Sequence, residues 1–77
     1  MPTYRAMYKF LDDGVHAEVI DFPGAITCGR DLTEARRLLH SALREMAETE
    51  LLCGRSLPDP NPLAVDPESD LEEPISL

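Results

Sequence analysis

Apolar and polar residues alternate over two neighbouring runs, residues 3–12 and 15–20. A period of two that includes aromatic and β-branched side chains is typical of strands with one buried face. The apolar residues on that face are Tyr4, Ala6, Tyr8, Phe10, Val15, Ala17 and Val19. We therefore expect both strands to turn this face toward the core.

Asp13-Gly14 separates the two runs. It predicts a β-hairpin with a two-residue turn, because Asp and Gly tolerate the positive φ of a type I′ turn. This register places Phe10 opposite Ala17. A shift by one residue would place Phe10 opposite His16 and mix the two faces. Gly14 is therefore a predicted structural position.

A bend follows at Phe22-Pro23-Gly24, where Pro lacks an amide donor and Gly permits positive φ. Residues 25–28 are short and apolar enough for a third strand, which we expect Gly29 to end. Asp31 predicts a helix N-cap, and Glu34 follows at the spacing of a capping box.

Residues 32–53 have the pattern of an amphipathic helix. Its apolar stripe consists of Ala35, Leu38, Leu39, Ala42, Leu43 and Met46. Gly54 suits the left-handed residue that closes a helix. Residues 1–55 therefore predict an α+β domain, in which an antiparallel sheet carries one long helix on one face.

The composition changes after this domain. Residues 56–62 hold three prolines, which exclude a helix. Residues 66–73 are acidic and poor in apolar side chains, so we expect a loose linker there. Residues 74–77 fit a short edge strand or a frayed end, and we favour the strand. The sequence thus predicts a separate Pro-rich acidic segment over residues 56–77.

The second face of the hairpin carries Met7, Leu11 and Ile20 among charged residues. It is too apolar for a solvated face and too charged for a core. We expect the C-terminal segment or another chain to cover it. A chain of 77 residues has a small core, so we also expect a dimer or a larger assembly, formed through this face or through exposed strand edges.

The chain has 15 acidic and 7 basic residues, and its formal net charge is −8. This balance argues against nucleic-acid binding and fits either solubility or a basic protein partner. No apolar run has the length of a signal peptide or a membrane span. We therefore expect a cytoplasmic protein that does not associate with membranes, with Cys28 and Cys53 as small, buried, reduced thiols.

No pattern in the sequence predicts catalysis. Asp12, Asp13, Glu18 and Asp21 flank the hairpin, but their spacing does not bring them to one point, as a metal-dependent nuclease requires. No Gly-rich phosphate loop is present. We expect no catalytic, cofactor-binding or metal-binding residues, and a hydrolase that uses the hairpin carboxylates is the weakest hypothesis.

Three runs, taken in order, resemble the HicB antitoxin family. They are Val19-Ile20-Asp21-Phe22-Pro23-Gly24, Thr27-Cys28-Gly29 and Asp31-Leu32-Thr33-Glu34-Ala35. An exit at Leu57-Pro58-Asp59-Pro60 completes the similarity, which covers residues 4–60. Ile20, Phe22 and Ala25 stand where the family pattern often has Pro, Leu and Cys.

The resemblance implies a partial ribonuclease-H-like β-β-β-α-β fold without nuclease chemistry. It also implies oligomers and a protein partner, the small RNA-cleaving toxin HicA, which has a double-stranded-RNA-binding-like fold. Many members carry a C-terminal DNA-binding domain. This sequence has an acidic Pro-rich segment in that place, so we expect no direct contact with nucleic acid.

Two functional hypotheses remain. One is an antitoxin-like protein that neutralises a HicA-type toxin by occluding it. The other is an orphan HicB-like oligomeric domain that binds a different protein. Candidate partner contacts are Asp21, Phe22, Pro23 and Gly24 in the bend, and Met7, Leu11 and Ile20 on the second face. Predicted structural residues are Gly14, Asp31, Glu34 and Gly54.

Overall fold

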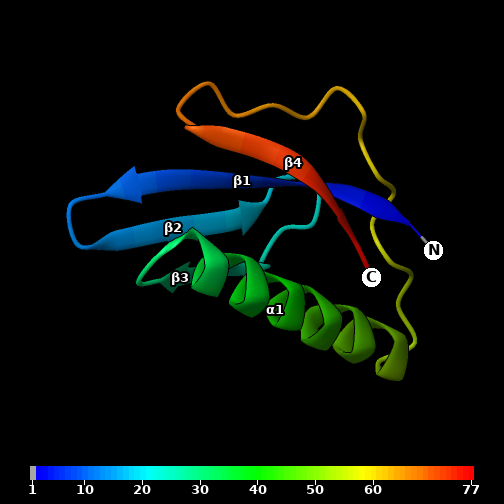
Figure 1. Cartoon of the computed structure of the whole chain (residues 1–77). Coiled ribbons are helices and arrows are strands. Elements are labelled where there is room, and N and C mark those ends of the chain that lie inside the picture. Colours follow the sequence, from blue (N-terminus) through cyan, green and yellow to red (C-terminus); the bar gives the residue numbers. More distant parts are fainter. Residues whose placement is uncertain (1) are drawn as a thin grey trace.

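The computed structural model describes residues 2–77. Its elements are β1 (Thr3–Leu11), β2 (Gly14–Val19), β3 (Ile26–Gly29), α1 (Leu32–Leu52) and β4 (Leu71–Ser76). The strands form one antiparallel sheet in the order β3-β2-β1-β4. One long helix packs against this sheet (Figure 1). The predicted α+β fold is confirmed.

The hairpin turn lies one residue earlier than the sequence predicted. Asp12 and Asp13 form the turn, and Leu11 pairs with Gly14. Tyr8 therefore lies opposite Ala17, a shift of two positions from the predicted register that leaves both faces unchanged. No residue of this turn has positive φ, so the predicted type I′ turn is wrong.

Gly14 is needed for a different reason. A Cβ atom at this position would lie 2.6 Å from the carbonyl oxygen of Gly29 on β3. Gly29 is equally confined, because its Cβ would lie 2.6 Å from the backbone nitrogen of Ala35. The two glycines allow β2, β3 and the start of α1 to approach closely.

The main core lies between α1 and the sheet. From the helix, Ala35, Leu39, Leu43 and Ala47 are buried at four-residue spacing. From the strands and the bend, the buried residues are Tyr4, Ala6, Tyr8, Val15, Ala17, Val19, Phe22 and Ala25. The predicted stripe is correct in its centre, whereas Leu38, Ala42 and Met46 are only half-buried.

The helix begins and ends as the sequence predicts. Asp31 is the N-cap, and its Oδ1 accepts a hydrogen bond of 2.8 Å from the Glu34 amide. The Glu34 carboxylate accepts a hydrogen bond of 3.0 Å from the amide of Arg30, the residue before the N-cap. In a strict capping box the donor would be the amide of the N-cap residue itself. Gly54 follows the helix with a φ of 75°.

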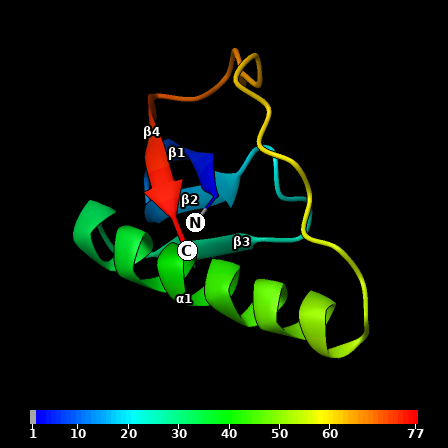
Figure 2. The same ribbon diagram turned by 90° about the vertical axis from the view of Figure 1, so that its right-hand side faces the viewer.

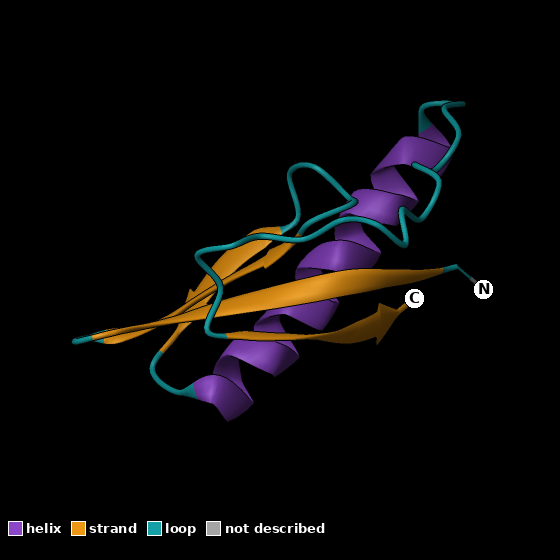
Figure 3. Ribbon diagram, turned by 90° about the horizontal axis from the view of Figure 1, so that it is seen from above, coloured by secondary structure: helices purple, strands orange, loops and turns teal. Residues whose placement is uncertain are grey.

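The C-terminal segment completes the sheet. β4 pairs with β1 from Thr3 opposite Ser76 to Tyr8 opposite Leu71, so the strand starts three residues before the predicted range. Residues 53–70 connect α1 to β4. They first run beside the end of the helix, where Leu57 packs against the helix-side core, and then pass along the side of the strands away from the helix (Figures 1 and 2). Seen from above, this connection passes over the strands while α1 lies beneath them (Figure 3).

Candidate interaction surfaces

Asp21 joins three separate parts of the chain. Its Oδ1 accepts a hydrogen bond of 2.9 Å from the amide of Arg5 on β1. Its Oδ2 accepts a hydrogen bond of 2.9 Å from the amide of Asn61 in the long connection. Both carboxylate oxygens are therefore engaged within the chain, which gives this predicted contact residue a structural role.

The bend offers only part of itself to solvent. Phe22 is fully buried and packs edge-on against Tyr4, with 5.2 Å between ring centroids. Pro23 and Gly24 are exposed. Phe22 was a predicted partner contact, but in this conformation its side chain belongs to the core.

The long connection covers the centre of the second sheet face. Met7 is only 3% exposed although it lies outside the helix-side core cluster. Ala64 is the other buried hydrophobic residue in residues 2–77 that lies outside this cluster. We expected either the C-terminal segment or another chain to cover this face. The C-terminal segment covers Met7, whereas Leu11 stays exposed and Ile20 is half-buried.

Hydrogen bonds to Glu72 fasten the connection. Its carboxylate accepts from Arg5 Nε at 2.9 Å, from the Asp66 amide at 3.2 Å and from Ser69 Oγ at 2.6 Å. These bonds, with the Ser69 hydroxyl first, hold the pKa of Glu72 below its usual value. The predicted loose linker over residues 66–73 is therefore tied to the sheet.

Glu73 links β4 to the helix. Its carboxylate accepts two hydrogen bonds from the Arg36 guanidinium, at 2.8 and 2.9 Å. The Arg36 guanidinium carbon lies 5.9 Å from the centre of the Tyr8 ring. Burial, followed by a hydrogen bond with Glu73, raises the pKa of Tyr8 to about 12.

The hairpin tip, defined as residues 10–13, projects from the body of the molecule (Figure 1). Phe10 and Leu11 are each 51% exposed. Asp12 and Asp13 are exposed beside them and make no ion pair or side-chain hydrogen bond. The Phe10 amide donates to Asp70 Oδ2 at 2.7 Å, which holds the base of the tip against the C-terminal segment. Apolar surface and unpaired negative charge therefore meet at one place.

Ion pairs within the chain engage most of its positive charge. The basic residues in ion pairs are Arg5, Lys9, Arg30, Arg36, Arg37 and Arg55. In residues 2–77, Arg44 is the one basic side chain without such a pair. Five exposed carboxylates have neither an ion pair nor a side-chain hydrogen bond within this described part of the chain: Asp12, Asp13, Glu45, Glu48 and Asp59. Carboxylates therefore dominate the charge that the chain presents to other molecules.

The structure does not gather the hairpin carboxylates into one site. Glu18 Oε1 lies 2.8 Å from His16 Nε2, while Asp21 is engaged with amides. His40 is on α1, and its Nε2 lies 3.0 Å from the backbone oxygen of Ser76. Across the described residues, no group of three or more His, Cys, Asp or Glu side chains has the arrangement of a metal site.

The expectation of buried thiols is wrong, because Cys28 and Cys53 are both exposed. Cys28 lies on the edge strand β3, and its side chain is on the sheet face that the long connection leaves open. Cys53 is the C-cap residue of α1, at the end of the helix and outside the core.

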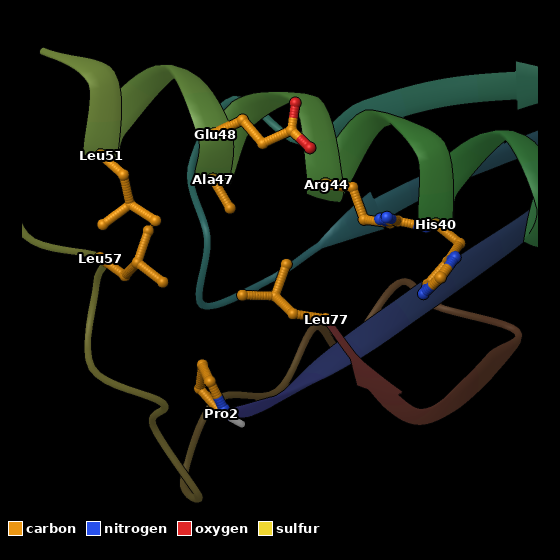
Figure 4. Close-up of a pocket in the computed structure, with 8 residues that line it drawn as sticks. All are labelled: Pro2, His40, Arg44, Ala47, Glu48, Leu51, Leu57 and Leu77. Atoms are coloured by element: carbon orange, nitrogen blue, oxygen red, sulfur yellow. The ribbon is translucent and has the colours of Figure 1, made fainter.

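A groove of about 480 Å³ runs beside the second half of α1 (Figure 4). Its lining residues are Pro2, His40, Arg44, Ala47, Glu48, Leu51, Leu57 and Leu77. The leucines point into it from the helix, the connection and the end of the chain (Figure 4). Sequence reasoning missed this groove, because these segments are distant in sequence and only the fold brings them together.

A scan against protein-family models and a search of curated proteins both found no match to this chain. The likeness to HicB antitoxins therefore depends on the motifs in residues 19–24, 27–29 and 31–35. Within the described part of the chain, no helix combines the length and the apolar character needed to span a membrane.

Proposed function

We propose that this chain is an antitoxin-like binding protein. It neutralises a small, basic, RNA-cleaving protein of the HicA type by covering that protein's RNA-binding surface, and it works as a dimer or larger assembly without catalysis of its own. The motif order and the β-β-β-α-β arrangement support the proposal. Because such a partner acts on RNA inside the cell, the proposal includes a cytoplasmic location.

The distribution of charge carries this proposal. A protein that cleaves RNA must present a basic surface to phosphate groups. This chain has six of its basic side chains in internal ion pairs, while exposed carboxylates at the hairpin tip have no internal partner. The same distribution supports the absence of direct nucleic-acid binding.

The hairpin tip, which includes the predicted contact Leu11, supports docking best. Asp12 and Asp13 attract a basic partner and accelerate the encounter, and Phe10 and Leu11 supply apolar contact that slows dissociation. Of the predicted contacts, Leu11 belongs to this tip. Pro23 and Gly24 are exposed at the bend, whereas Met7 and Phe22 are buried.

The proposal expects a small basic protein to be encoded beside this chain, and the test begins by producing that protein. The two proteins are mixed, and binding kinetics and RNA cleavage are measured. We expect a stable complex that no longer cleaves RNA. Recovery of active toxin from a saturated mixture, or no binding at micromolar concentration, would refute the proposal.

A charge-reversal pair tests the surface. Asp12→Lys with Asp13→Lys should slow association by about tenfold at low salt and flatten its salt dependence. The matched control is Glu45→Lys with Glu48→Lys, which makes the same change of charge on the exposed side of α1. If both pairs slow association equally, only net charge matters, and the hairpin tip is not the docking surface.

The groove beside α1 favours a second candidate function, an orphan oligomeric domain that binds a different protein. Its apolar lining could take a side chain or a short segment of that partner. In this case Leu57→Asp should abolish capture of the partner, while Leu11→Ala should leave it unchanged. The reverse result supports the antitoxin-like function.

A further inference from the structure

β3 and β4 form the two edges of the sheet, and they are protected differently. β4 contains Pro74 and, just before it, the acidic residues Glu72 and Glu73. Proline and charge on an edge strand are how natural proteins block unwanted strand pairing. β3 has the sequence Ile-Thr-Cys-Gly, with no charge and no proline. The β3 edge therefore lacks the usual protection of an exposed strand.

The backbone of β3 has groups ready for another strand. The Val19 amide donates to the Ala25 oxygen at 2.9 Å, which marks this as a hydrogen-bonded pair. Such pairs alternate along an antiparallel ladder, so the next one joins Ala17 and Thr27. The N–H and C=O groups of Ile26 and Cys28 consequently point away from β2, toward the open edge.

The side chains along this edge are apolar and accessible. Ile26 is 53% exposed, and Cys28 is exposed on the same face of the strand. Thr27 lies between them on the face toward the helix. A strand that pairs with β3 would cover the side chains of both Ile26 and Cys28.

One flank of α1 adds apolar side chains on the helix side of this edge. The opposite flank contacts β4, through Arg36 with Glu73 and His40 with Ser76. Because successive helix residues are rotated by about 100°, Leu38 and Ala42 lie on the flank that borders β3. Both are half-buried, so apolar side chains lie on both sides of the β3 edge, Ile26 and Cys28 on the face away from the helix and Leu38 and Ala42 on the helix below.

We propose that a second copy of this chain pairs with β3, antiparallel, about a two-fold axis through Thr27. Ile26 of each copy then lies opposite Cys28 of the partner subunit, and both outward-facing residues take part in hydrogen-bonded pairs. The two sheets become one continuous sheet. Leu38 and Ala42 of the two helices meet beneath the junction.

A second copy fits this edge because the edge is complementary to itself. The order apolar, polar, apolar over Ile26, Thr27 and Cys28 is the same in both directions, and no like charges face each other. The inference rests on the self-association in the proposed function and is independent of the toxin. Because each copy has a net charge of −8, added salt should strengthen the dimer by screening repulsion.

The first experiment is sedimentation equilibrium at low and high salt. Wild type should form a dimer that tightens with salt. Ile26→Lys should weaken it by at least about tenfold, because it places a charge in the apolar contact between Ile26 and Cys28 of the partner subunit. The matched control is Leu63→Lys. Leu63 is a more exposed leucine in the connection, at 84% against 53% for Ile26, and this variant should dimerise as wild type does. Equal melting temperatures would show that both variants fold.

The second experiment tests the register of the proposed strand pairing by disulfide formation under oxidation, in a chain that carries Cys53→Ser. Hydrogen-bonded antiparallel partners have Cα atoms about 5.5 Å apart, which suits a disulfide. Adding Ile26→Cys should give covalent dimers through Cys28 of the partner subunit. Cys28 alone, or Ile26→Cys with Cys28→Ser, should give few.

The outcomes separate this inference from the wider function. A monomer at all concentrations refutes both the edge dimer and the proposed self-association. A dimer that Ile26→Lys leaves unchanged, or one that Cys28 alone cross-links efficiently, overturns the edge or its register and leaves toxin binding intact. Loss of toxin binding with a normal edge dimer refutes only the proposed function.

Discussion

Asp21 accepts two hydrogen bonds, and we expect substitutions of Asp21 to lower the free energy of unfolding by different amounts. Asp21→Ala removes the acceptor for the Arg5 amide, which is part-buried, and for the Asn61 amide, which is exposed. Leaving a buried amide unpaired costs about 1–3 kcal/mol. Water can replace the acceptor at the exposed amide, so that loss is about 0.5 kcal/mol.

Asp21→Ala should therefore lower the free energy of unfolding by about 1.5–3.5 kcal/mol. Asp21→Asn keeps one oxygen, which can face the Arg5 amide, while its NH₂ group faces the Asn61 amide. We expect a loss of only about 0.5–1 kcal/mol for Asn. The order of stability is then wild type, Asn, Ala.

Urea denaturation gives the free energies, and hydrogen exchange gives the site. In Asp21→Ala the amides of Arg5 and Asn61 should both exchange faster, since the connection over residues 53–70 loses an anchor. Asp13→Ala is the matched control, because Asp13 is exposed and has no side-chain hydrogen bond. Equal stability of all the variants, with unchanged exchange at Asn61, would refute the structural role of Asp21.

Three further predictions concern the core, the glycines and alkaline pH. Leu39→Ala should cost about 2–5 kcal/mol in urea denaturation because Leu39 is fully buried, and a loss as small as that of the exposed Leu52→Ala would contradict the packing. Gly29→Ala should lower the free energy of unfolding by about 1–3 kcal/mol, because the added methyl group overlaps the Ala35 backbone. A melting temperature equal to that of wild type would contradict this prediction. Folding favours the neutral Tyr8 phenol, whose pKa is about 12 against an ordinary 10.0. Its contribution to stability is therefore complete below pH 10 and declines as the pH rises toward 12. In thermal melts at alkaline pH, Tyr8→Phe should reduce the loss of stability with rising pH. An unchanged loss would refute the prediction.

The position of the hairpin turn shows how far a local pattern determines a structure. Alternation identifies which side chains share a face, and a register shift of two residues preserves that assignment. The sequence pattern therefore could not distinguish a turn at Asp13-Gly14 from the observed turn at Asp12-Asp13. The close approach of Gly14 to Gly29 favours the observed register, and β3 must already be in place for that contact to exist.

The roles of the cysteines and of Met7 depended on what covers each face. Alternation places Met7 on the second face of its strand, but neither that strand nor the short strand that holds Cys28 shows whether anything packs on these side chains. The connection covers Met7 and leaves Cys28 open. Asp21 is similar, because its acceptor role depends on amides 16 and 40 residues away in the sequence.

The sequence by itself determined the order of the first four elements, the two faces of the hairpin, the centre of the helix stripe and both helix caps. These features depend on contacts within a few residues, such as Asp31 with Glu34, so periodicity and short motifs encode them. Only the tertiary structure decided that residues 71–76 form the fourth strand, and that the hairpin tip and the β3 edge remain accessible. These features depend on pairing between distant segments, such as β1 with β4, and no local pattern specifies the partner of a strand.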